Sequence, residues 1–249
     1  LLKLVDPQGS ARFVEFISHY DKATMTRGVL DWPYNEALRL DWFAGSLACS
    51  GHDKLVFHES HDEAANASGS ARTISVAVNG APLIGATRTV AESRVRLCAG
   101  LSLLSAGTPM FFMGEEIGAQ KPYKYNNFLE NREDILGERS SNGKTLFHYY
   151  QALIGLGHRL RSIRGHNIDV LHASNTHRVI AFKRWNASEE VIIVASFNNS
   201  PFAEGYRIAK DSIAIPDGQW KEIFNSDAAA YGGQNIGNCG AIIPSFQAS

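Results

Sequence analysis

Long apolar runs, a surplus of charge of either sign and paired cysteines are all missing from this sequence of 249 residues. No apolar stretch approaches the roughly 20 residues that cross a bilayer, so we expect no membrane segment. The formal net charge of −1 argues against a general affinity for nucleic acid or an anionic membrane surface. Apolar residues at 44% and charged residues at 20% are typical of a folded chain of one large or two smaller domains.

The cysteines are few as well. Cys49, Cys98 and Cys239 are an odd number without the spacing of metal ligands, and Cys98 lies in a helical apolar pattern that predicts a core position. A reducing compartment fits best, which predicts a cytoplasmic protein. The chain begins Leu-Leu-Lys-Leu, with neither an initiator Met nor a signal-peptide pattern, so we expect a piece of something longer.

Short apolar runs and long amphipathic segments alternate before about residue 165. The runs 54–59 and 110–113 predict buried strands of a parallel sheet, because their apolar residues are consecutive. Apolar spacing predicts helices over 34–47, 90–106 and 144–161. The first helix should turn Leu38, Trp42 and Leu47 inward, the second Val90, Leu97, Leu101 and Leu104, and the third Leu146, Tyr150, Leu153 and Leu160.

The stretch between the first predicted strand and the second helix, residues 64–89, reads as a loop far longer than the usual 2 to 6 residues. Loops of that length inside a compact protein are usually functional. Gly107 suits a position just past a helix end, and Pro109 prevents the helix from continuing. The order strand, helix, strand, helix predicts two consecutive βα units.

After residue 165 the pattern changes to closely spaced alternating segments broken by Asn, Gly, Ser and Pro. Short strands with hairpin-length connections predict a small antiparallel β-sandwich. The expected strands are 168–172, 178–185, 190–197, 205–208, 212–215 and 220–224. We therefore divide the chain into an α/β part, residues 1–165, and an all-β domain, residues 166–249.

The most informative motif is Phe57-His-Glu-Ser-His-Asp-Glu63, which follows the first predicted strand. The second predicted strand also ends in acids, Glu115 and Glu116. Parallel strands share a direction, and α/β barrels carry their chemistry at the carboxyl ends of the strands. We therefore expect His61 and Asp62 to lie near Glu115 and Glu116.

Several kinds of site use such residues. A metal site is disfavoured, because His61 and Asp62 are adjacent and would face opposite ways in an extended chain. A Ser60-His61-Asp62 triad is disfavoured further, since triad members come from separated segments. Paired carboxylates around a scissile bond are typical of sugar chemistry, and an added carboxylate that grips ring hydroxyls would fit here.

Each candidate also has a structural alternative. Glu115 and Glu116 could cap the next segment or line the rim of a site, and Glu59 could be the buried partner of Arg72 or Arg94. Trp32 and Trp42 could stack on sugar rings, although their helical spacing favours core packing.

Two motifs together resemble the α-amylase superfamily (glycoside hydrolase family 13). Residues 57–63 resemble its motif at the end of barrel strand seven, and Gly107-Thr-Pro-Met-Phe-Phe-Met-Gly-Glu-Glu116 resembles its eighth strand. The spelling Glu-Ser-His-Asp-Glu is similar to that of 1,4-α-glucan branching enzymes. Further stretches that fit bacterial branching enzymes, the last two as strands of their all-β domain, are 127–134, 167–171, 191–198 and 220–227.

The resemblance implies a fold and a chemistry. The fold would be the C-terminal part of a (β/α)8 TIM barrel, about strands seven and eight, followed by the small antiparallel all-β domain. Asp62 would be the third catalytic carboxylate, which holds sugar hydroxyls and distorts the ring toward the transition state. His61 would hydrogen-bond the same sugar, Glu59 and Ser60 would shape the pocket beneath, and Glu115 and Glu116 would add substrate contacts. The substrate would be an α-glucan (glycogen, amylose or a maltooligosaccharide), with no cofactor or metal.

The sequence departs from the family pattern in one respect. The family's nucleophile is an Asp in a Gly-x-Arg-x-Asp setting and its general acid is a Glu after strand five, and we find neither motif. A whole barrel needs about 250 residues, more than precede the all-β domain. The resemblance therefore implies a fragment that lacks branching activity and self-associates through unpaired strand edges.

Two other functions stay open. A hydrolase of the same superfamily, acting on α-glucans or on a trehalose precursor, differs only in whether water or a sugar hydroxyl accepts the cleaved chain. A non-catalytic glucan-binding or scaffold protein would explain the missing carboxylates, but it would have no physical need for an intact Glu-Ser-His-Asp-Glu.

Overall fold

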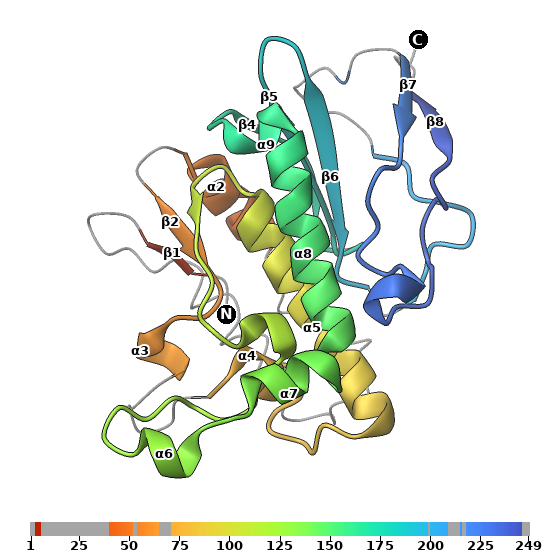
Figure 1. The fold of residues 1–249 in the computed structure, drawn as a ribbon. Coiled ribbons are helices and arrows are strands. Elements are labelled where there is room, and N and C mark those ends of the chain that lie inside the picture. The colour runs from red at the N-terminus through yellow and green to blue at the C-terminus, as the bar shows by residue number, and fades with distance from the viewer. Residues whose placement is uncertain are drawn as a thin grey trace.

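The computed structural model describes residues 3–5, 40–51, 54–64, 71–198, 200–208, 215 and 218–245. In it, a group of helices with a small sheet lies beside an antiparallel sheet, and a two-stranded ribbon lies at the C-terminal end (Figure 1). None of the helices in these ranges is both long and apolar enough to cross a membrane. The predicted elements outside these ranges, among them Trp32, Leu38 and most of 212–215, lie outside the described residues.

The first sheet has the strand order β1-β2-β3, with β1 at Lys3–Val5, β2 at Leu55–Phe57 and β3 at Thr108–Pro109. Strands β2 and β3 pair in parallel, and helix α5, Gly85–Leu104, connects them, which confirms a βαβ arrangement. Strand β1 pairs with β2 antiparallel. Three strands with one antiparallel pairing are not the closed parallel sheet of a barrel, which the described residues do not contain.

The second predicted strand is displaced. Residues 110–113 are not a buried strand, as predicted: Met110 N still donates to Val56 O over 2.9 Å, but Phe111 is 38% exposed and Met113 is 48% exposed. The reason is the length of the partner. Strand β2 ends at Phe57, so the ladder has nothing to pair with beyond Met110, and the chain turns at Gly114, whose φ is 93°.

The three predicted long helices are confirmed with shifted bounds. They are α2 at Leu40–Ala48, α5 at Gly85–Leu104 and α8 at Lys144–Arg159. The prediction for Trp42 was wrong, since it is 59% exposed and Phe43 is buried in its place beside Leu40 and Leu47. One residue of difference turns the helix by about 100°, enough to exchange a core side chain for a surface one.

In the stretch predicted as a long loop, the described residues 71–89 contain helical structure. Within them lie α4, Thr73–Val76, and the first turn of α5, which begins at Gly85 rather than at Val90. Five short helical segments complete the helical part: α3 at His61–Ala64, η1 at Glu115–Ile117, α6 at Phe128–Asn131, α7 at Ile135–Ser140 and α9 at Arg161–Arg164.

The C-terminal part forms two antiparallel sheets. The first has the order β4-β5-β6, with strands Ile168–Ser174, Val179–Trp185 and Glu190–Ser196. The second pairs β7, Gly218–Lys221, with β8, Ile242–Ser245, and the short helix η2, Ala229–Tyr231, lies between them in sequence. The predicted strand at 205–208 is wrong, because these residues form no ladder, and β8 was not predicted.

One apolar core joins the helical part to the β4-β5-β6 sheet. It includes Phe43 of α2, Tyr149 of α8 and Phe182 of β5, and the Phe43 ring meets Phe197 edge-on at 6.3 Å. Arg184, on β5, is fully buried at this junction, and its guanidinium donates to five backbone carbonyl oxygens of both parts. The two parts therefore pack as one body around β2 and β3.

Candidate functional site

The motif residues leave the sheet at the carboxyl end of β2 and enter a one-turn helix. His58, Glu59 and Ser60 follow β2 directly and are at most 4% exposed. His61 opens α3 and is exposed. Asp62 lies in the same turn, and its side chain is outside the described residues. The buried half of the motif is thus fixed in the core, while the turn that carries His61 and Asp62 lies toward the surface.

Glu59 is held by the segment that follows the motif. Its Oε1 lies 2.7 Å from Arg72 Nη2, and both side chains are at most 4% exposed. The contact is ionic without the alignment of a hydrogen bond, whereas Thr73 N donates to Glu59 Oε2 over 2.6 Å. Arg72 also donates to Met113 O over 2.9 Å and lies over the Phe112 ring. Arg72 therefore connects the ends of β2 and β3, which confirms it as the buried partner of Glu59.

His58 makes the second buried pair. Its Nε2 lies 2.9 Å from Glu115 Oε2, and both side chains are 1% exposed. On the other side of the ring, Nδ1 lies 3.2 Å from Ser102 Oγ, and that hydroxyl already donates to Cys98 O. Both ring nitrogens of His58 therefore have a polar partner, Ser102 on α5 and Glu115 on η1.

Tyr150, on helix α8, is the fifth member of a buried polar group that also contains Glu59, Arg72, His58 and Glu115. Its hydroxyl donates to Glu115 Oε2 over 3.2 Å and lies 3.4 Å from His58 Nε2. Burial raises the pKa of Tyr150 well above 10, and the nearby carboxylates raise it further, so the phenol keeps its proton. The neutral phenol can therefore act as a hydrogen-bond donor over the whole physiological range.

Glu115 and Glu116 have different surroundings. Glu115 is 3% exposed, and its Oε1 accepts from Phe112 N over 2.5 Å. Glu116 is half-buried and accepts from Gly114 N over 2.8 Å, so it stabilises the turn from which η1 starts. The alternative that these acids cap the next segment is confirmed for Glu116, whereas Glu115 belongs to the buried group.

Burial is the main influence on the pKa of the Glu59 carboxyl. It raises the pKa of Glu59 above the ordinary 4.5, Arg72 opposes the shift, and the Glu115 carboxylate adds to it. Two carboxylates at neighbouring strand ends thus compete for charge, with one Arg and one His to balance them. A buried carboxyl with a raised pKa, like that of Glu59, is often found at a functional site.

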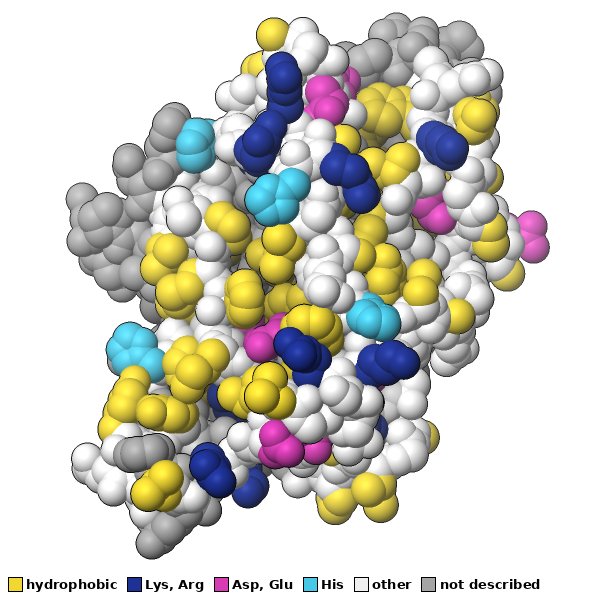
Figure 2. Space-filling model, in the orientation of Figure 1, with side chains coloured by type: hydrophobic (Ala, Val, Ile, Leu, Met, Phe, Trp, Pro, Cys, Tyr) yellow, Lys and Arg dark blue, Asp and Glu magenta, His cyan; other side chains and the backbone are white. Residues whose placement is uncertain are grey.

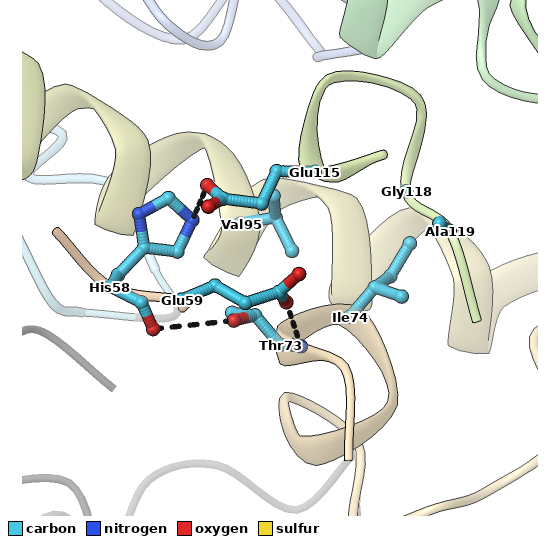
Figure 3. A pocket seen from close by; sticks show the side chains of 8 residues that line it. All are labelled: His58, Glu59, Thr73, Ile74, Val95, Glu115, Gly118 and Ala119. Atoms are coloured by element: carbon cyan, nitrogen blue, oxygen red, sulfur yellow. Dashed lines mark hydrogen bonds and ion pairs between the residues drawn. The ribbon is translucent and has the colours of Figure 1, made fainter. Parts of the chain in front are cut away.

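A small pocket lies against these groups (Figure 3). Its volume is about 10 Å³, room for about one water molecule, and it is lined by His58, Glu59 and Glu115 among eight residues. The pocket is therefore too small to hold a sugar. Among the residues that the structure describes, no three His, Cys, Asp or Glu side chains are grouped as metal ligands.

The predicted site residues are therefore only partly brought together. Glu59 and Glu115, from the two strand ends, line one pocket. The expected approach of His61 and Asp62 to the two acids stays a prediction. Sequence reasoning offered Arg72 as a partner of Glu59 but missed His58 and Tyr150 as members of the group. His58 lies inside the motif, but Tyr150 is 92 positions away and its spacing marked it only as a core residue.

Comparison with known proteins adds an independent finding. Residues 170–246 match the family model of the alpha amylase C-terminal all-beta domain, which the antiparallel sheets β4-β5-β6 and β7-β8 fit. The 1,4-alpha-glucan branching enzyme of Burkholderia thailandensis is 27% identical over 222 residues, 84% of this chain and 24% of that enzyme. The chain is similar to α-amylase-type branching enzymes. The resemblance predicted from the two strand motifs is thereby confirmed.

Other matches are shorter. The branching enzyme of Pseudomonas putida is 47% identical over 66 residues, 26% of this chain and 8% of that enzyme. The chain thus spans no more than about a quarter of the length of either branching enzyme. A different protein, the protein-methionine-sulfoxide reductase catalytic subunit of Ralstonia nicotianae, is 54% identical over 44 residues, 16% of this chain and 13% of that protein. A match of 44 residues does not define the family of a chain of 249.

Proposed function

We propose that the chain is part of a 1,4-α-glucan branching enzyme. Residues 1–165 would be the C-terminal portion of its catalytic (β/α)8 barrel, and residues 166–249 its all-β domain. The observation that carries the proposal is the parallel pair β2–β3, whose carboxyl ends bring Glu59 and Glu115 into one pocket, with Ser60, His61 and Asp62 following Glu59 directly in the chain. The carboxyl ends of parallel strands are where a barrel places its active site.

The exposed residues of the site would bind the sugar, and the buried residues would hold them in position. At the surface, Asp62 would hold sugar hydroxyls and support the transition state, and His61 would donate a hydrogen bond to the same sugar. Beneath them, Ser60, Glu59 and Glu115 would hold the turn in place through the buried pairs with Arg72 and His58. Glu116 would shape the rim through its bond to Gly114 N. Preorganised polar groups of this kind favour a cationic, oxocarbenium-like transition state.

The proposed reaction is glycosyl transfer with retention. An α-1,4 bond of glycogen, amylose or a maltooligosaccharide would be cleaved through a glycosyl-enzyme intermediate, and a 6-hydroxyl of a glucan would then accept the chain. The intermediate keeps the energy of the cleaved bond, so the reaction needs no cofactor. The nucleophile and the general acid would come from the rest of the enzyme. The enzyme would act in the cytoplasm. The edge of β3 would pair with that missing part or with a second copy.

Three experiments test this function. Purified chain incubated with amylose should change neither the iodine stain nor the number of reducing ends; turnover would overturn the assignment of this chain as an incomplete site. The coding sequence upstream of Leu1 should contain an in-frame Gly-x-Arg-x-Asp segment. In the longer protein, D62N should lower the yield of α-1,6 branches, measured after debranching, at least about 100-fold. Reducing ends without branches would instead identify a hydrolase.

A further inference from the structure

A pair of tyrosines lies beside the turn that carries His61 and Asp62. Tyr123 N donates to Ala64 O over 2.9 Å, and Ala64 is the last residue of α3. Helix α3 is a single turn, so its first and last residues are only about 5 Å apart along the axis. The segment 121–127 is thus attached to the helix on which the candidate site is built, and Figure 1 draws α3 and α6 on the same side of the molecule.

The two rings are held against each other and reach the surface. The centroids of Tyr123 and Tyr125 are 5.0 Å apart with the ring planes at 74°, and Tyr125 is 48% exposed. Figure 2 shows hydrophobic side chains gathered on the surface where Figure 1 draws α3. An aromatic ring fixed by a neighbouring ring, with half of its surface in water, is suited to an amphipathic partner.

The segment is also fixed in advance of any ligand. Glu133 accepts hydrogen bonds from Gln120 N and from Lys121 N, each over 2.9 Å. Asn131 Nδ2 donates to Pro122 O, and Asn127 N donates to Lys124 O over 3.2 Å. Binding to a surface that is already ordered has a smaller entropic cost than binding to a loose loop.

We propose that Tyr125, supported by Tyr123, is a sugar-stacking residue that extends the candidate site along an α-glucan chain. The inference rests on the function proposed above and adds a binding residue to the same site. The C–H face of a pyranose packs on an aromatic ring, while its hydroxyls stay in water or reach polar neighbours such as the exposed Asn126. An open surface, unlike the small pocket beneath, accommodates a polymer that continues in both directions.

The test compares ring and non-ring replacements in the full chain of 249 residues. Retardation in gels that contain glycogen gives the affinity of the wild type, Y125F, Y125L and, as an exposed apolar control on α7, L136A. Y125F should bind within about twofold of the wild type, and L136A should be unchanged. Y125L should bind about five- to tenfold more weakly, since it stays apolar but loses the ring face.

Four outcomes would overturn the proposal. Y125L that binds like the wild type would remove Tyr125 from the site. Y125F that is as weak as Y125L would assign the contact to the hydroxyl and not to the ring. Both results would leave the proposed function intact. A wild-type chain with no affinity for glycogen would contradict both the stacking residue and the glucan as ligand of this chain. Sedimentation measures the oligomeric state of the same variants. If the wild type is a dimer and Y125L is a monomer, the ring of Tyr125 makes contacts between two copies of the chain and not with a sugar.

Discussion

At their carboxyl ends, β2 and β3 are joined by titratable side chains: Glu59 pairs with Arg72, and Glu115 pairs with His58. At their amino ends the same two strands are held mainly by backbone groups, with Thr108 N donating to Lys54 O and Ala106 N to Ser50 Oγ. A buried charge there, Arg184, donates to backbone carbonyl oxygens. The comparison separates an end that can respond to pH and to a ligand from an end that can only hold the fold together.

The amino end should be the more sensitive to a single change. Arg184→Met leaves the carbonyls of Leu104, Ser105, Ile163, Gly165 and Asn167 buried without their donor. We expect a loss of about 4 kcal/mol in the free energy of unfolding, measured by urea denaturation. Burial lowers the pKa of Arg184 to about 10, which still leaves it charged at neutral pH.

The control for that change is Arg207→Met, at an exposed position of the C-terminal part, which should alter stability by no more than about 0.5 kcal/mol. Equal effects of the two replacements would show that the junction does not depend on the guanidinium.

At the carboxyl end, Arg72→Met should lower the free energy of unfolding by about 3 kcal/mol at neutral pH, because it leaves Glu59 buried without its cation. The pKa of Glu59 is already raised above 4.5 in the folded protein, so its contribution to stability is complete below pH 4.5 and is lost as the pH rises through the folded value. Without Arg72 that pKa rises further, and the loss should be larger at pH 8 than at pH 5.

A matched control is Arg88→Met, which breaks the pair with Glu92 on α5, where both side chains are partly exposed. We expect a loss of no more than about 1 kcal/mol with little dependence on pH. A loss for Arg72→Met that does not change between pH 5 and pH 8 would contradict the assignment of Glu59 as the responding group.

A change in packing at the amino ends of β2 and β3 should have a smaller effect on the free energy of unfolding. A methyl group at Gly107 would lie 2.7 Å from Lys54 O and from Val56 Cγ2, closer than any carbon can approach. Gly107→Ala should therefore cost about 2 kcal/mol. In the matched change Gly155→Ala, on α8, the new methyl meets nothing within 4 Å, and it should stabilise by about 0.5 kcal/mol. The same sign for both melting shifts would rule out this close approach as the reason for glycine at 107.

Tyr149 and Tyr150, adjacent on α8, should show the smallest difference in the free energy of unfolding between two matched changes. Tyr150→Phe removes a hydrogen bond to the Glu115 carboxylate, and Tyr149→Phe removes one to the backbone carbonyl of Arg96. Bonds to charged groups are the stronger, so we expect losses of about 2 and about 1 kcal/mol. A larger loss for Tyr149→Phe than for Tyr150→Phe would contradict the hydrogen bond from Tyr150 to the Glu115 carboxylate as the stronger of the two.

Much of the secondary structure could be predicted from the sequence, because apolar spacing is a local property. Helices α5 and α8 and strands β4, β5 and β6 lie close to their predicted positions. The failures have tertiary causes. Residues 110–113 are apolar enough for a strand but lack a partner beyond Met110. Trp42 fits the inward stripe of a helix as well as Phe43 does, and only packing against Phe197 selects Phe43.

For the candidate site, the sequence by itself determined the chemistry: two acid-bearing motifs at the ends of two strands, and a resemblance to the α-amylase superfamily that the comparisons confirm. Only the tertiary structure decided the partners. Glu59 meets Thr73 across 14 positions, Glu115 meets Tyr150 across 35, and His58 meets Ser102 across 44. Residue type fixes what a side chain can do, whereas its charge and its partner depend on which distant helix excludes water from it.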